Sequence, residues 1–276
     1  MNLFSYFARV ACAAGLCAMA ALAAGGSASA QTSNLAMRTT EPLDSRPAAP
    51  AVTRGILPAA ASWKALLVGG NHLIDNYNNA ATDLAARLRE HGVHRVAVLH
   101  SLGPQAGDAV PAARRKDMRR AMTALGTTAA DTCLFFISSH ANQRGIYLSA
   151  ERGYLSPRDL SSMIDAECGD RPTVLILSGC DTGTFITSSL KGDNRIILTA
   201  SARGRVSYGA TTSDRYVNFD RCMIKAVDEG AGTWRDVFAR TQTCVSERER
   251  MLGVEPSEPQ AWFGSGVSQL AVPGRS

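Results

Sequence analysis

The sequence predicts an α/β fold in which helices flank a mostly parallel β-sheet. Short apolar runs alternate with helical stretches of ten or more residues, which is the pattern of βαβ units. The apolar runs lack polar alternation, as expected of strands that are covered on both faces. The chain has 276 residues and is 45% apolar, so it can bury a large core.

The first 30 residues have the features of a secretory signal peptide. One arginine precedes an apolar run over residues 10–24, and Ala28-Ser29-Ala30 offers an A-x-A cleavage site. The run is too short to span a bilayer. We therefore expect a secreted or periplasmic protein with no stable membrane insertion after cleavage, and retention as an uncleaved anchor is the alternative.

Residues 31–62 are rich in Ala, Pro, Thr and Ser and show no periodicity. Such a composition is typical of a disordered leader or linker, with a propeptide as the alternative. Residues 63–270 are expected to form one domain. Their predicted strands are 64–70, 95–101, 132–140, 172–180 and 194–202, and 144–149 is expected to be a hairpin arm. The predicted helices are 78–92, 111–126, 156–167, 214–229 and 234–252.

Helix boundaries follow from local signals. The first helix ends at Gly92, and Pro111 is expected near the first turn of the second. In the third helix Ser156 is the expected N-cap and Pro157 the first helical residue, and Thr233 caps the last helix.

The charge balance is too weak to indicate a nucleic-acid partner, and none is expected. The formal net charge is +5, and residues 1–30 contribute a single arginine, so the mature chain keeps about +4, a mild excess. The densest positive cluster is "RRKDMRR", residues 114–120. Met118, Met122 and Leu125 lie behind it at helical spacing. A solvated helix face is the favoured interpretation, and an anion site is the alternative.

The cysteine count predicts two disulfides and one free thiol. Five cysteines remain after signal removal, an odd number in an oxidising compartment. If Cys180 is the free thiol, three pairings of the other four are open. We favour Cys133–Cys168, expected at the starts of two strands, and Cys222–Cys244, expected on two successive helices.

Two strand ends carry reactive side chains. His140 follows the third predicted strand and Cys180 the fourth, and a single helix joins the two strands. Parallel neighbours would bring both tips to one edge of the sheet. There an imidazole can deprotonate a thiol, and the amides of Ala141 and Cys180 can hold an oxyanion. The alternative is that both residues have structural roles only, Cys180 as a core thiol and His140 as a hydrogen-bonded loop residue.

Three segments, in the same order along the chain, resemble the legumain-like cysteine peptidases, and especially their bacterial members, within the caspase-like group. They are "LFFISSHANQRGIYLS", "PTVLILSGCDTGTF" and "IILTASARGRVSYG". "SDRYVNF" and the late "EPQAWFG" extend the resemblance, which runs over residues 64–264. It implies a caspase-like three-layer sandwich, with His140 as the base and Cys180 as the nucleophile.

Further residues carry over from the resemblance by position. The family has an Asn-Tyr pair after its first strand whose asparagine orients the histidine, and "DNYNNA" supplies Asn76 for this role, with a helix cap as the alternative. The substrate pocket would include Asp181 after the nucleophile, Asp214 on a looser alignment, and Ser207 on the strand that lines it.

Two positions depart from the family pattern. Glycine normally follows the histidine, but here Ala141 does, so activity requires a negative φ at this turn. The pocket arginine is replaced by Asn78. Loss of this cation should weaken acceptance of aspartate before the cleaved bond and favour asparagine, lysine or arginine there.

The expected function is that of a secreted or periplasmic cysteine endopeptidase that cleaves peptide or protein substrates through a thioester acyl-enzyme. Transpeptidation by the same dyad is one alternative, and a disabled peptidase fold that binds peptides is another. No cofactor or metal is expected. His72, His94 and His100 lack metal-ligand spacing, and "VGGNHLIDN" lacks a dinucleotide fingerprint. The oligomeric state is left open.

Overall fold

A computed structural model describes residues 62–102, 110–126, 128–209 and 214–274. The chain divides into units Met1–Val52 and Thr53–Ser276, and all described residues belong to the second. The expected signal peptide, its cleavage site and nearly all of the expected leader lie outside the described residues. Ser62, assigned to that leader, instead begins the first strand. Within the described ranges, no helix is both long enough and apolar enough to cross a membrane.

A six-stranded sheet forms the centre of the unit, in the order β2-β1-β3-β7-β8-β9. Its strands are β1 Ser62–Gly69, β2 Arg95–Leu99, β3 Asp131–Ser138, β7 Thr173–Ser178, β8 Arg195–Thr199 and β9 Gln260–Phe263. The first five are parallel and correspond to the five predicted strands, whereas β9 pairs antiparallel with β8 at the edge. The mostly parallel sheet of the prediction is therefore confirmed.

A second, three-stranded antiparallel sheet follows the third central strand. It consists of β4 Ala141–Asn142, β5 Gly145–Leu148 and β6 Gly153–Leu155. The expected hairpin arm at residues 144–149 corresponds to β5. This small sheet continues the chain directly after His140, so it shapes the surroundings of the catalytic candidates.

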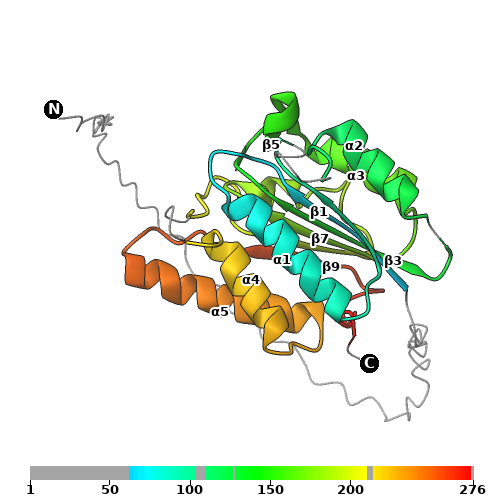
Figure 1. Cartoon of the computed structure of the whole chain (residues 1–276). Helices are drawn as coiled ribbons and strands as arrows, with labels where there is room; N and C mark the ends of the chain where they lie inside the picture. The colour runs from blue at the N-terminus through cyan, green and yellow to red at the C-terminus, as the bar shows by residue number, and fades with distance from the viewer. Residues whose placement is uncertain (1–61, 103–109, 127, 210–213, 275–276) are drawn as a thin grey trace, which may run out of the picture. The chain divides into compact units, whose positions relative to one another are not determined.

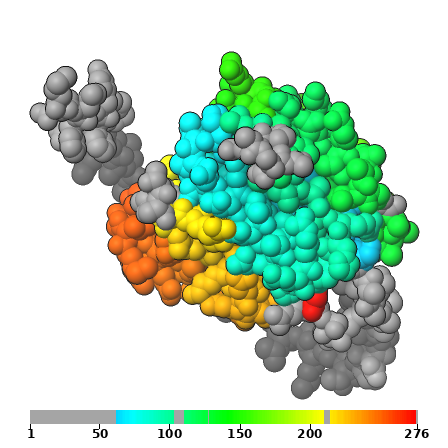
Figure 2. Space-filling model, viewed as in Figure 1, coloured from blue at the N-terminus to red at the C-terminus, as the bar shows by residue number. Residues whose placement is uncertain are grey.

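Helices cover both faces of the central sheet (Figure 1). Their bounds are α1 Asn76–Glu90, α2 Arg115–Ala124, α3 Pro157–Glu167, α4 Asn218–Asp228 and α5 Trp234–Leu252, with short 3₁₀ turns η1 Ser149–Glu151 and η2 Thr182–Phe185. Residues of α1, α4 and α5 build one apolar core, and those of α2 and α3 build the other. Figure 2 shows α1, α4 and α5 side by side on the surface that covers the first of these cores. The resulting three layers are helix, sheet and helix.

Two helices begin where their sequence signals predict. In α3, Ser156 is the N-cap, and its hydroxyl oxygen accepts from the Asp159 amide at 3.2 Å. The Ser156 amide in turn donates to the Asp159 carboxylate at 3.2 Å, and the two bonds form a capping box. Pro157 lies in the first turn of the helix. Thr233 and Asp236 form the same motif at the start of α5. Local side-chain chemistry therefore fixes these two boundaries.

Helix α2 begins later than predicted. It starts at Arg115 rather than near Pro111. Residues 111–113 run alongside the end of β2, where Ala112 bridges to His100 and the Ala113 amide donates to the His100 carbonyl at 2.7 Å. A tertiary backbone pairing therefore overrides the helical start signal of the proline.

Helix α4 also begins late, at Asn218 rather than Asp214. The amide of Asn218 donates to the Tyr208 carbonyl, and the backbone oxygen of Asp214 accepts from the Asn76 side chain. These contacts with other segments hold residues 214–217 outside the helix.

The basic cluster at residues 114–120 forms a solvated helix face, as predicted. Met118 and Met122 are buried behind it. On the outer side, Arg115 pairs with Glu151 at 2.7 Å and with Asp159 at 3.3 Å. The cations are therefore partly neutralised by neighbouring elements.

Both favoured disulfides are present, and Cys180 is the free thiol of the described residues. Cys222 and Cys244 lie on α4 and α5, as expected. Cys133 lies near the start of β3, but Cys168 is the C-terminal cap of α3 rather than the start of a strand. The expected position of Cys168 was wrong because the chain needs residues 169–172 to turn before β7 begins.

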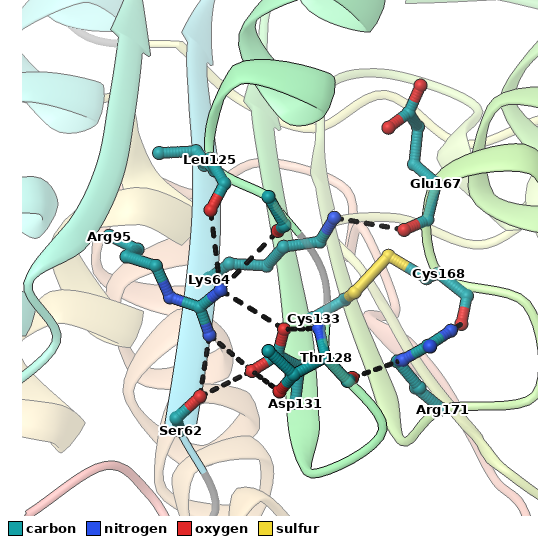
Figure 3. Close-up of polar contacts among 11 residues, drawn as sticks. Ser62, Lys64, Arg95, Leu125, Thr128, Asp131, Cys133, Glu167, Cys168 and Arg171 are labelled. Carbon is teal, nitrogen blue, oxygen red and sulfur yellow. Dashed lines mark hydrogen bonds and ion pairs between the residues drawn. A yellow bond between two sulfur atoms is a disulfide. The ribbon is translucent and has the colours of Figure 1, made fainter.

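A polar cluster joins the N-terminal ends of β1, β2 and β3, at the sheet edge away from His140 and Cys180 (Figure 3). Arg95 donates to both oxygens of the buried Asp131 carboxylate and to Ser62. These bonds hold the pKa of Asp131 well below its usual range, against the opposing effect of burial. The buried ammonium of Lys64 donates to the Glu167 carbonyl at 2.9 Å, which ties β1 to α3.

Candidate active site

The two strand ends predicted to carry the chemistry are adjacent. Strands β3 and β7 are parallel neighbours, and Ser138 lies opposite Ser178 in their register. One residue further, the Ser139 amide donates to the Ser178 carbonyl at 3.0 Å. His140 and Cys180 therefore leave the same edge of the sheet from neighbouring strands.

Gly179 allows these two tips to lie close together. A Cβ atom at this position would lie 2.5 Å from the Ser139 carbonyl oxygen and 3.1 Å from the Ala141 side chain. A backbone oxygen cannot move aside as the end of a flexible side chain can. The residue before Cys180 must therefore be glycine for the backbone beyond β7 to pass β3 at this distance.

The His140 ring contacts Tyr77 on α1. The Tyr77 hydroxyl lies 3.3 Å from Nδ1, and the two rings meet edge to face with centroids 5.4 Å apart. Partial burial lowers the pKa of His140 from its ordinary value. Burial also raises the pKa of Tyr77, so its hydroxyl stays protonated. The site thus holds a neutral imidazole with one ring nitrogen partnered by a phenol.

The Cys180 thiol is partly exposed and points to the segment after β8. Its Sγ lies 3.5 Å from the Ser207 carbonyl oxygen, within reach of a weak S–H donor. Ser207, predicted as a substrate-binding residue on a strand, instead lies in an irregular segment beyond the end of β8 at Thr199, and it meets the thiol through its backbone. Among the described residues, Cys180 is the cysteine available for nucleophilic chemistry.

Asn76 and Asn78 have partners other than the histidine. The buried Asn76 is the first residue of α1, and its side-chain amide donates to the Asp214 carbonyl. Asn78 binds Ser101 twice, by donating to its hydroxyl at 3.2 Å and accepting from its amide at 3.1 Å. Contact with the His140 ring comes from Tyr77, the neighbour of Asn76. The orienting role of Asn76 stays a prediction.

Asp181 fixes the loop that follows β8. It adopts a left-handed backbone conformation, with φ of 57°, directly after the nucleophile candidate. Its carboxylate accepts from the Gly204 amide at 2.6 Å, and its own amide donates to the Arg205 carbonyl at 2.8 Å. This buried carboxylate therefore links the tip of β7 to residues 204–205.

Asp214 is partly exposed and makes structural contacts through both its carboxylate and its backbone. Its carboxylate pairs with Arg221 of α4 at 2.6 Å, and its carbonyl accepts from Asn76. The structure thus joins two residues that the sequence predicted for different roles.

Ala141 satisfies the condition set by the sequence. Among the described residues, Arg152, Asp181 and Glu258 are the non-glycine residues with positive φ, so the Ala141 backbone has negative φ. It begins β4 and pairs with Ile146 of β5. Alanine therefore fits this turn without backbone strain.

Two residues beneath the site were not predicted. Tyr77 contacts His140, and its only sequence signal is its place beside Asn76. Asp220 on α4 is fully buried, and its carboxylate accepts from the Ser138 hydroxyl. Burial raises the pKa of Asp220 to about 7, which the hydroxyls of Ser138 and Ser178 partly oppose. Ser138 and Ser178 lie two residues before His140 and Cys180, so this buried carboxyl lies beneath the strand ends that carry both candidates.

Comparison with known proteins places the chain in a family. The family model described as the Peptidase C13 family matches residues 111–269, more than half of the chain and a range that includes His140 and Cys180. The crystal structure of caspase-1 from Spodoptera frugiperda is similar, with a TM-score of 0.52 and 15% sequence identity over 73% of this chain and 86% of that chain. At this identity the likeness shows the fold alone.

No curated protein matches the sequence significantly. The family match and the fold agree with the resemblance found in the ordered His and Cys segments. The chain therefore belongs to the Peptidase C13 family, the legumain family, and has a caspase-like fold.

Proposed function

We propose that this protein is an exported cysteine endopeptidase in which His140 activates Cys180. Membership of the Peptidase C13 family implies a cysteine peptidase. The observation that carries the assignment of residues is the register of β3 and β7, which brings His140 and the free thiol of Cys180 to one edge of the sheet. The signal features of residues 1–30 support export.

The pKa of His140 supports its role as the base. Burial lowers the pKa of His140 and so favours the neutral imidazole, which is the form that can accept a proton. The Tyr77 hydroxyl, as acceptor of the Nδ1 proton, leaves Nε2 free to take the thiol proton of Cys180. Tyr77 is thus a positioning residue in this proposal.

The reaction then proceeds through an acyl-enzyme. The Cys180 thiolate attacks the peptide carbonyl, and the amides of Ala141 and Cys180 stabilise the oxyanion. His140 returns the proton to the leaving amine, which leaves a thioester on Cys180. Water, deprotonated by His140, hydrolyses the thioester and restores the thiol.

The pocket for the residue before the cleaved bond lies beside Ser207 in this proposal. The Ser207 carbonyl already faces the thiol, and Asp214 is partly exposed. Asp181 holds the adjacent loop, and Asn78 contributes no cation. These features favour asparagine, lysine or arginine over aspartate at the cleaved bond.

Labelling with iodoacetamide at mildly acidic pH, read by peptide mass, tests the dyad. Rapid labelling confined to Cys180 is the expected result for the wild-type protein. His140→Ala should slow it by on the order of a hundredfold, because no base then lies beside Cys180 to take the thiol proton. His94→Ala, which removes an exposed histidine, is the matched control and should leave the rate unchanged.

Two outcomes would contradict the proposal. One is Cys180 that stays unlabelled or is found in a disulfide. The other is a labelling rate that does not depend on His140. If the dyad is reactive, peptides with single asparagine, lysine or arginine sites should be cleaved by the wild-type protein and left intact by Cys180→Ala.

A further inference from the structure

A polar cavity of about 810 Å³ lies beyond the catalytic loops. Arginine and hydroxyl side chains dominate its lining, which contains no acidic residue. It is lined by Gln143, Arg144, Ser156, Pro157, Arg158, Thr184, Thr187, Ser188, Ser189 and Arg203. A cavity with this composition suits an anionic ligand.

Its walls continue directly from the two catalytic loops. Gln143 and Arg144 form the turn after His140, between β4 and β5. Thr184 lies in η2, which begins two residues after Cys180. A Cβ atom on Gly183 of this turn would lie 2.6 Å from the Arg203 amide nitrogen, so the Arg203 loop packs against it. A ligand in the cavity therefore touches extensions of both loops.

The three cavity arginines lack anionic partners. Across the ranges that the structure describes, the guanidinium groups of Arg144, Arg158 and Arg203 form no hydrogen bond or ion pair, and Arg144 stacks over the Tyr154 ring at 4.6 Å. The neighbouring Asp159 is not available to them, because it bonds Ser156 and Arg115. Three unpaired cations thus converge from three separate segments.

We propose that this cavity binds carboxylates of acidic residues in the peptide that lies across Cys180. The proposal rests on the proposed function and adds a substrate class to it. A guanidinium pairs with a carboxylate through two parallel hydrogen bonds. The hydroxyls of Ser156 and Thr184 already donate to Asp159 and to the Asp181 carbonyl, so the donors left for the remaining acceptors are Ser188 and one member of the Thr187–Ser189 pair. An extended peptide advances about 3.4 Å per residue, so an acidic residue a few positions from the cleaved bond reaches the adjoining loops.

Binding of labelled peptides to the Cys180→Ala protein, followed by fluorescence anisotropy, tests the proposal without cleavage. One peptide carries glutamates on both sides of a single asparagine, and its partner carries glutamines at the same positions. The acidic peptide should bind at least about tenfold more tightly at low salt, with a smaller difference at high salt. Replacing Arg144, Arg158 and Arg203 together by glutamine should abolish the difference.

Arg250→Gln provides the matched control, because Arg250 is an exposed arginine on α5, on the other face of the sheet. It should leave the preference intact. Equal affinity for the two peptides, or a preference that survives the triple substitution, would overturn the proposal. The two proposals fail in different experiments. An unreactive Cys180 in the labelling experiment would contradict the proposed function, whereas the anisotropy measurement uses Cys180→Ala and does not depend on the thiol.

Discussion

The His140 ring is held by a phenol rather than by an amide. Tyr77 contacts Nδ1 and meets the ring edge to face, while Asn76 binds the Asp214 backbone. The asparagine thus fixes the start of α1 to residue 214, and the next residue on the helix reaches the histidine. The orienting role expected of Asn76 stays a prediction, and in this arrangement it would act through the position of α1.

Asp220 is a fully buried carboxyl beneath this arrangement. Its carboxyl accepts from Ser138 on β3, and Ser178 on β7 also influences its pKa. Both serines lie two residues before the catalytic candidates. Through the Ser138 hydroxyl, Asp220 joins α4 to β3, the strand that leads to His140.

Asp220 predicts a specific pH dependence of stability. Its folded pKa of about 7 lies above the ordinary value of about 3.9. Below pH 4 both states are protonated and the group has no effect. As pH rises from 4 to 7 the unfolded chain ionises first, so the free energy of unfolding falls, by roughly 4 kcal/mol in total. Asp220→Asn removes this loss and should gain stability relative to wild type as pH rises.

Urea unfolding of both proteins between pH 4 and pH 8 measures this difference. Asp228→Asn is the matched control on the same helix, because Asp228 is partly exposed and pairs with Arg87 at 2.6 Å. It should cost less than about 1 kcal/mol. A constant difference between Asp220→Asn and wild type across this range would show that the buried carboxyl has an ordinary pKa.

At the scale of elements, the tips of β3 and β7 depend on Gly179. The change Gly179→Ala places a methyl group 2.5 Å from the Ser139 carbonyl oxygen, so the tips must separate. We expect a loss of about 1–3 kcal/mol in unfolding free energy, as for overpacked sites, and slower labelling of Cys180. Gly153→Ala on β6 is the control, because its methyl group would meet its nearest atoms at 3.7 Å. Unchanged labelling in Gly179→Ala would contradict the close approach.

The elements most accessible to sequence reasoning were those with local signals. Each strand of the parallel sheet is a buried apolar run, and α3 and α5 carry capping boxes. The starts of α2 and α4 could not be predicted in this way, because pairing with His100 and contacts from Tyr208 and Asn76 decide them. These partners are distant in sequence and leave no local pattern.

The site residues divide in the same way, into those with a signal in the sequence and those placed by contacts between distant segments. His140 and Cys180 could be placed together because parallel order brings strand ends to one edge. Asp220 did have a signal, since it lies three residues before Met223 and seven before Val227, on the buried face of α4. The place of Tyr77 beside Asn76 did not predict its contact with His140, because that contact depends on how α1 packs against the sheet.

At the scale of the whole molecule, the two disulfides brace opposite faces of the sheet. Cys133–Cys168 closes a separation of 35 residues in the core beneath α2 and α3, and Cys222–Cys244 closes 22 residues between α4 and α5. Loop-closure entropy predicts that each stabilises the fold by about 3–4 kcal/mol. Because the two lie in separate cores, their contributions should add.

Alanine pairs at each disulfide, alone and combined, test this expectation by urea unfolding. Each pair should lose about 3 kcal/mol, and the combined variant should lose the sum within about 0.5 kcal/mol. In the combined variant Cys180 is the remaining cysteine of the described residues, and its labelling should stay rapid wherever the protein is folded. A combined loss far above the sum would mean that the sheet couples the two helical layers, and slow labelling in the folded variant would mean that the disulfides help to position the tips of β3 and β7.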